Sequence, residues 1–130
     1  MKIKRPAYYD LEFNSELEAR WYVLFAEQGI EVTLHPDPPP EVGPFPIQPS
    51  FLIDDVWFYA LVVPHGKSPS KKALDDFLEW DGEGASGLWI LEGPPADKLY
   101  GGCHPSFHWQ QIPTPEFKRA LAIALSIQFE

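Results

Sequence analysis

One short segment of the chain holds three side chains of the types that bind metal ions. Cys103, His104 and His108 form the pattern Cys-His-x-x-x-His, and thiolate and imidazole groups are the ligands that zinc prefers. His65 or His35 would serve as a distant fourth ligand. The paired Cys-x-x-Cys element of structural zinc sites is absent. A partly buried cysteine beside two surface histidines explains the same pattern, so the sequence favours no metal here and keeps zinc as an alternative.

Two other catalytic motifs are missing from the sequence. It has no glycine-rich loop of the dinucleotide-binding or P-loop type, which would hold phosphate groups with backbone N–H groups. It also has no Gly-x-Ser-x-Gly element, the sharp turn that exposes the nucleophile of α/β-hydrolases. The sequence therefore gives no support to either kind of chemistry.

Hydrophobic periodicity indicates the elements that would position functional groups. Alternation with a period of two indicates strands, and apolar residues three and four apart indicate amphipathic helices. The expected strands cover residues 7–13, 30–35, 51–53, 56–63 and 88–91, with a weaker candidate at 107–112, and the expected helices begin at Ser15, Ser68 and Thr114. We therefore predict an α/β (α+β) fold: one domain over residues 1–130 with a mixed central sheet flanked by helices.

The first and last helices have the clearest signals. Ser15 and Glu18 have the spacing of a capping box, and Gly29 suits the position just after a helix that runs to about Gln28. In the strand that follows, an apolar set alternates with a polar set: Ile30, Val32 and Leu34 against Glu31, Thr33 and His35. The last helix is predicted to place these residues on one face: Phe117, Leu121, Ala124, Leu125 and Gln128.

A proline-rich stretch interrupts this order of elements. Seven prolines lie between residues 36 and 49. Proline fixes φ and donates no backbone hydrogen bond, so we expect a stiff, irregular loop. It lies inside the domain, because too little chain precedes it to form an independent core.

Five segments in a fixed order carry a family resemblance over nearly the whole chain. They are Ser15 to Trp21 with Gly29-Ile30-Glu31, Pro49-Ser50-Phe51-Leu52-Ile53, Trp57 to Val62, Leu88 to Pro95, and Arg119 to Glu130. Together they resemble small phage and bacterial nuclease-like proteins of the PD-(D/E)xK family. The resemblance implies a restriction-endonuclease-like core with a metal site on two adjacent strands.

The resemblance also implies which positions would carry catalysis. In such nucleases two carboxylates chelate Mg²⁺, and a lysine two residues after the second carboxylate helps to activate water. The positions that match are Ser50 for the aspartate, Ala60 for the second carboxylate and Val62 for the lysine. Glu18, which matches a helix glutamate that often joins the metal, is the only carboxylate left among them. We therefore expect a degenerate site with no catalytic residue and no cofactor.

Other interpretations of these residues stay open. In an active Mg²⁺-dependent nuclease with a rearranged site, Glu18 would bind the metal together with Asp54 or Asp55, and Lys67 would be a displaced catalytic lysine. Aspartates also favour turns between strands, and a lysine after Pro64 and Gly66 also fits a solvated loop. The capping box by itself explains Glu18 equally well.

The sequence is also rich in aromatic residues, with Trp 5, Tyr 5 and Phe 9. Trp21 and Trp89 fit the core. Exposed aromatic residues mark contact sites, so the following are candidates for a binding surface: Trp57, Tyr59, Trp80, Tyr100 and Trp109. Packing of these rings beneath the proline-rich loop is the alternative.

Composition and charge narrow the choice of partner and compartment. The 130 residues carry Lys+Arg 10 and Asp+Glu 19, a formal net charge of −9. Nucleic-acid binding depends on Lys and Arg that neutralise phosphates, so this charge disfavours DNA and RNA. A single cysteine suits a reducing cytoplasm. The longest apolar run, residues 56–63, is far shorter than the ~20 residues of a transmembrane helix, so we expect no membrane insertion.

These observations predict a catalytically inactive nuclease-fold protein that binds another macromolecule, preferably a protein. The resemblance to phage proteins implies a phage-encoded factor that docks on a host machine, such as RNA polymerase or a defence complex, in the host cytoplasm. An acidic surface suits a basic groove on such a target. The alternatives are the active Mg²⁺-dependent nuclease and a zinc-stapled binding module.

Overall fold

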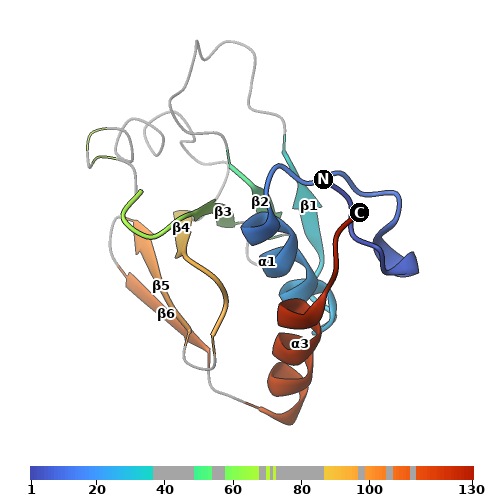
Figure 1. Cartoon of the computed structure of the whole chain (residues 1–130). Helices are drawn as coiled ribbons and strands as arrows, with labels where there is room; N and C mark the ends of the chain where they lie inside the picture. Colours follow the sequence, from blue (N-terminus) through green and yellow to red (C-terminus); the bar gives the residue numbers. More distant parts are fainter. Residues whose placement is uncertain are drawn as a thin grey trace.

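The architecture is that of a computed structural model, which describes residues 1–36, 49–53, 58–67, 70, 72, 87–96, 99–104, 107–111 and 114–130. For residues 58, 87–89, 99–104 and 107–111 it describes the backbone only. The elements in these ranges are η1 (Pro6–Tyr8), α1 (Glu16–Ala26), β1 (Val32–Leu34), β2 (Phe51–Ile53), β3 (Phe58–Val63), β4 (Gly87–Glu92), β5 (Leu99–His104), β6 (Phe107–Gln111) and α3 (Pro115–Ser126) (Figure 1).

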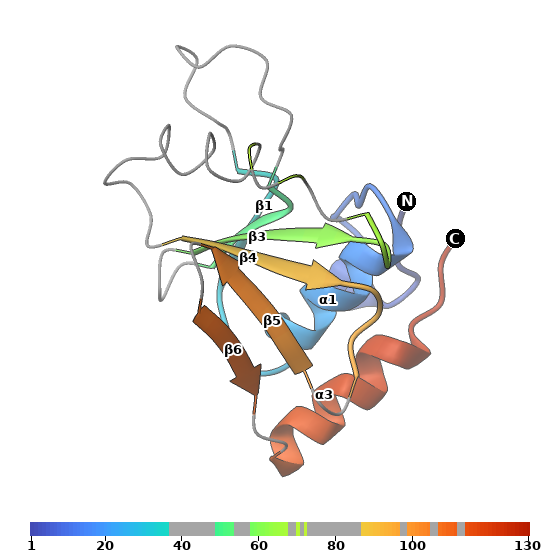
Figure 2. The same ribbon diagram turned by 90° about the vertical axis from the view of Figure 1, so that its left-hand side faces the viewer.

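The strands form one mixed sheet in the order β1-β2-β3-β4-β5-β6. β3 and β4 run parallel (Figure 2), and each of the other neighbouring pairs is antiparallel. β3 has a neighbour on both sides, as its continuous apolar run predicts for a central strand. The prediction of an α+β fold with a mixed sheet and helices is confirmed at this level.

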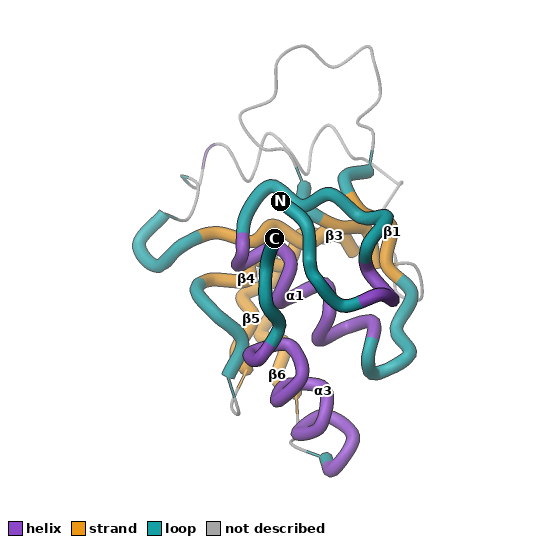
Figure 3. The backbone as a smooth tube through the Cα atoms, turned by 45° about the vertical axis from the view of Figure 1, so that its right-hand side comes forward, coloured by secondary structure: helices purple, strands orange, loops and turns teal. Residues whose placement is uncertain are grey.

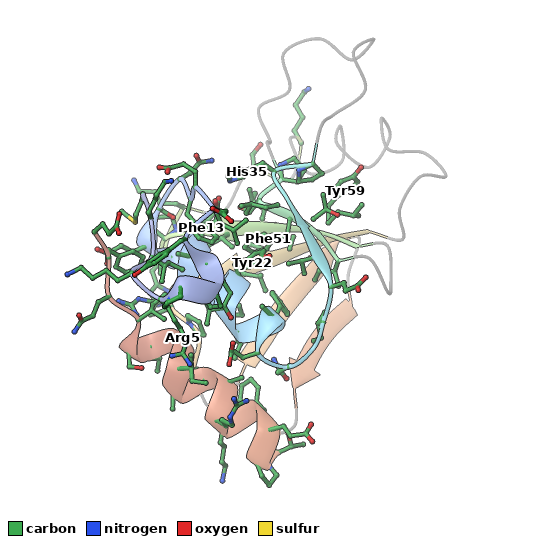
Figure 4. All side chains as sticks on the ribbon, turned by 90° about the vertical axis from the view of Figure 1, so that its right-hand side faces the viewer. Arg5, Phe13, Tyr22, His35, Phe51 and Tyr59 are labelled. Carbon is green, nitrogen blue, oxygen red and sulfur yellow. The ribbon has the colours of Figure 1, made fainter. Side chains whose placement is uncertain are left out.

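Helices α1 and α3 pack against each other, and α1 also packs against β1 and β3 (Figure 1). Phe51 of β2 lies opposite Ala60 of β3, so both point to the same face of the sheet, and both are fully buried. The Tyr22 ring of α1 lies between Phe13 and Phe51, with ring centroids 5.4 and 6.0 Å away (Figure 4). The core therefore lies between the two helices and this face of the sheet.

The signals at the ends of α1 act as predicted, with one difference. The Glu18 N–H donates to Ser15 Oγ at 3.1 Å, which is the expected cap. The Glu18 carboxylate accepts from the Asn14 N–H at 3.1 Å rather than from Ser15, so the reciprocal bond of the capping box reaches one residue further back. At the other end Gly29 has φ 76, and the N–H groups of Gly29 and Ile30 donate to the carbonyls of Ala26 and Phe25, which makes a Schellman motif.

Three expectations differ from the structure. Residues 7–13 form no strand: η1 replaces its start, the N–H groups of Tyr8, Tyr9 and Leu11 bond to nearby carbonyls, and none of the described strands pairs with this segment. β5 was not expected, since two glycines interrupt it. Leu125 is 46% exposed, because the buried stripe of α3 runs through Phe117, Ala120, Leu121 and Ala124 instead.

The helix expected after Ser68 falls almost wholly outside the described residues.

The first and last residues of the described chain lie side by side (Figure 3). Ile3 and Phe129 form an isolated antiparallel bridge, the Lys4 N–H donates to Gln128 O at 2.9 Å, and the Glu130 N–H donates to Lys2 O at 3.1 Å. Ile3 is fully buried in this bridge. The basic start of the sequence is therefore attached to the end of the chain that follows α3.

Candidate functional site

The four positions that the family resemblance marks come together in space. Ser50 directly precedes β2, and its N–H donates to Ala60 O at 2.8 Å. The Val62 N–H donates to Ser50 Oγ at 3.2 Å. His35 connects this pair of strands to α1, because its N–H donates to Ser50 O at 2.9 Å and its Nε2 lies 2.5 Å from Glu18 Oε1. We call these five residues the Glu18 corner.

Glu18 lies in the first turn of α1 with only 6% of its side chain exposed. A buried carboxylate is costly unless donors compensate it. Its Oε1 atom has two such partners, the His35 imidazole and the Asn14 N–H. The hydroxyl cap from Ser15 holds the helix turn that carries it. The one carboxylate of the corner is therefore already engaged within the protein.

His35 reaches Glu18 because its backbone leaves the strand conformation. Alternation along β1 predicts that His35 points to the same side as Glu31 and Thr33. Instead His35 follows the end of β1 with φ 50, a left-handed value that few residues other than glycine adopt, although histidine is among the enriched types. This turn brings the ring to the side of α1 (Figure 4). The sequence analysis named His35 only as a distant zinc ligand and missed its pairing with Glu18.

The other three side chains of the corner supply no charge. The Ser50 hydroxyl is buried and accepts the Val62 N–H, Ala60 is fully buried, and Val62 is a half-buried hydrocarbon. Within the described ranges, no three His, Cys, Asp or Glu side chains are grouped closely enough to hold a metal ion. The chemistry available at the corner is thus that of one imidazole, one carboxylate and one hydroxyl.

Apart from Glu18, the residues of the active-nuclease alternative are not brought to the corner by any described contact. Asp54 and Asp55 lie outside the described residues. Lys67 is exposed in the turn after β3, where its N–H donates to Pro64 O at 3.1 Å. This alternative stays a prediction.

The zinc alternative also stays a prediction. Cys103 and His104 are on β5 and His108 is on β6, two strands for which only the backbone is described; the register pairs Cys103 with Phe107 and His108 with Gly102. Of the two distant ligands, His35 is paired with Glu18, and His65 has its Nδ1 3.7 Å from Glu92 Oε2.

The turn after β4 requires a glycine at position 93, which lies in one of the segments that carry the family resemblance. Gly93 has φ 73, and a Cβ atom there would lie 2.3 Å from His65 Nε2, so only glycine fits without a shift of the ring. The buried Trp21 Nε1 donates to Gly93 O at 2.8 Å, which confirms Trp21 as a core residue. This bond attaches α1 to the end of β4.

The aromatic binding surface cannot be assembled from the described residues. Tyr59 is half-buried on β3 and, by strand alternation, lies on the opposite face from Ala60 (Figure 4). Tyr100 and Trp109 are on β5 and β6, opposite Gln110 and Gly101 in the backbone register. Trp57 and Trp80 lie outside the described residues, and the side chain of Trp89 is not described either. These residues remain predicted contacts.

Comparison with known protein families, with curated proteins and with solved structures found no match for this chain. Among the helices described, none is long and apolar enough to cross a lipid bilayer.

Proposed function

We propose that this protein is a catalytically inactive, nuclease-like protein that acts in the cytoplasm by binding another protein. One observation supports the proposed lack of catalytic activity. The only carboxylate of the Glu18 corner faces an imidazole of its own chain at 2.5 Å, and the other positions offer a hydroxyl and two hydrocarbons.

The arrangement of the corner supports the family resemblance. Ser50 precedes β2, Ala60 and Val62 follow on the adjacent β3, and Glu18 approaches them from α1. That is the spatial relation that the resemblance implies for a nuclease site. The residues at these positions, however, lack the second carboxylate and the lysine that Mg²⁺-dependent hydrolysis requires.

The charge of the chain supports a protein partner. A net charge of −9 repels phosphates and favours a basic surface. Complementary charge raises association rates and suppresses wrong partners, so an acidic protein of this size suits a basic groove on its target. A phage-encoded factor that docks on a host machine, such as RNA polymerase or a defence complex, is the form of this proposal that the resemblance favours.

Cleavage assays test the proposed lack of nuclease activity. Single- and double-stranded DNA and RNA are incubated with the protein and Mg²⁺ or Mn²⁺, with Glu18→Ala as the matched variant. We expect no cleavage above that of the variant. Cleavage by the unchanged protein that Glu18→Ala abolishes would establish the active-nuclease alternative, and zinc in the purified protein would establish the zinc alternative.

Affinity capture from host lysate tests the proposed binding of a protein partner. We expect a stoichiometric protein partner whose retention falls as the salt concentration rises, because salt screens charge complementarity. Failure to retain any stoichiometric partner contradicts this half and leaves the cleavage result unaffected.

A further inference from the structure

The two ring nitrogens of His35 have different surroundings. Nε2 lies 2.5 Å from Glu18 Oε1, and because an ionised carboxylate only accepts, the proton of this contact belongs to Nε2. Nδ1 has no hydrogen-bond partner in the part of the chain that the structure describes, and 33% of the side chain is exposed. Among the described residues, the ring is thus held at Nε2 and has no partner at Nδ1.

Several independent features hold the ring in this orientation. Glu18 is fixed by the Ser15 cap and by the Asn14 N–H. The His35 N–H is bonded to Ser50 O, and the His35 backbone stays left-handed at φ 50, directly before Pro36. Unfavourable backbone conformations persist where the surrounding structure enforces them, and they occur preferentially at functional sites.

We propose that Glu18 and His35 form a reactive carboxylate–imidazole pair, in which Nδ1 of His35 is the nitrogen that attacks an electrophile or accepts a hydrogen bond from an O–H or N–H group. Glu18 is the positioning residue. A carboxylate that accepts from one ring nitrogen fixes the tautomer, so the other nitrogen keeps its lone pair available. The inference does not depend on the proposed function, since it concerns the reactivity of the ring in the isolated protein.

The reactivity of each nitrogen can be measured with diethyl pyrocarbonate as the probe. Nδ1 would attack one carbonyl carbon, a new N–C bond would form, and ethyl carbonate would leave and break down to CO₂ and ethanol after taking up the Nε2 proton. The nitrogen that carries the ethoxycarbonyl group is identified by ¹⁵N NMR of the modified protein. His65, with 77% of its side chain exposed, is the internal reference.

We expect His35 to be modified at Nδ1 in the unchanged protein. Glu18→Gln keeps an acceptor oxygen and should preserve that selectivity, whereas Glu18→Ala should lose it and give the Nε2 adduct. His65 should react equally in all three proteins, and circular dichroism checks that each is folded. Should Glu18→Ala fail to fold, the unchanged protein and Glu18→Gln still decide the result.

A purely structural role for the pair makes different predictions. The ring would then be unreactive in the unchanged protein, or would react at Nε2 as the contact opens. Either result overturns the proposal. Retention of the Nδ1 adduct in a folded Glu18→Ala protein overturns the positioning role of Glu18.

Discussion

The α1–α3 interface and the Glu18 corner each depend on a charged residue of α1, two positions apart in the sequence. In the interface, Arg20 Nη1 donates to Ala124 O at 2.9 Å and to Leu125 O at 2.8 Å, and its guanidinium lies 5.4 Å from the centre of the Phe129 ring. These carbonyls lie in the last turn of α3, where no intrahelical donor is available. In the corner, the buried Glu18 has the His35 ring as its side-chain partner.

The two regions differ in whether water can replace a hydrogen-bond partner that a mutation removes. Arg20 is only half-buried, so water can reach the carbonyls that it leaves. Glu18 is buried, so removal of the imidazole leaves a charge with little access to water. The interface should therefore tolerate substitution better than the corner does.

The largest effect is expected for His35→Ala. Removal of the hydrogen-bond partner of a buried polar group costs about 1–3 kcal/mol and more for a charged group, so we expect about 3 kcal/mol of lost unfolding free energy. Urea denaturation followed by circular dichroism measures it. Glu18→Gln added to His35→Ala should recover part of the loss, since the remaining side chain is then neutral. A loss below about 1 kcal/mol contradicts the difference between the regions.

A smaller loss is expected for Arg20→Met, which keeps an apolar stem beside Phe129 but removes both hydrogen bonds. We expect about 1–2 kcal/mol, because hydrogen bonds from a charged donor stabilise by about that amount when water replaces them. The matched control is Arg119→Met, whose Nη2 lies 3.6 Å from Glu27 Oε1 on the surface and which should cost about 0.5 kcal/mol or less. An Arg20→Met loss equal to that of His35→Ala would show that the two regions are equally sensitive.

The two helix caps should show the same difference at a smaller scale. Ser15 Oγ accepts from the Glu18 N–H at 3.1 Å and Thr114 Oγ1 accepts from the Phe117 N–H at 3.0 Å, so the bonds themselves are equivalent. Loss of such a cap costs about 1 kcal/mol. We expect Ser15→Ala to exceed Thr114→Ala in the same urea experiment, because Ser15 also holds the turn that carries Glu18. Equal losses would show that the cap and the corner are independent.

The smallest effect is expected for His65→Ala. Its imidazole lies 3.7 Å from the Glu92 carboxylate on the surface, a kind of pair that contributes about 0–1 kcal/mol. Little change in the urea midpoint should result, in contrast to His35→Ala. A loss as large as that of His35→Ala would show that exposure does not distinguish the two histidine–glutamate pairs.

Local patterns predicted the elements whose signals lie within a few residues. The Ser15 cap and the Gly29 Schellman motif bound α1, Thr114 begins α3, and the apolar run of β3 gave a central strand. The pattern of alternating residues failed to predict strands correctly where strand formation depends on pairing with a neighbouring strand. Residues 7–13 alternate like a strand but pair with none of the strands that the structure describes, whereas β5 contains two glycines but has a partner on both sides.

The candidate site shows the same division. The resemblance selected Glu18, Ser50, Ala60 and Val62, and these positions do meet in the structure. It did not select His35, because the strand pattern placed that side chain on the other face. Only its left-handed backbone brings the ring to Glu18, and nothing in the local sequence specifies this conformation before proline.

The sequence by itself determined which chemical groups the four matched positions carry, because the absence of a second carboxylate at Ala60 and of a lysine at Val62 is read directly from the residue types. It also determined where α1 begins and ends, because caps act within one helical turn. Only the tertiary structure decided which side chain is the hydrogen-bond partner of Glu18. That choice depends on a contact between residues 17 positions apart, and burial makes such a contact necessary only once α1 has packed on the sheet.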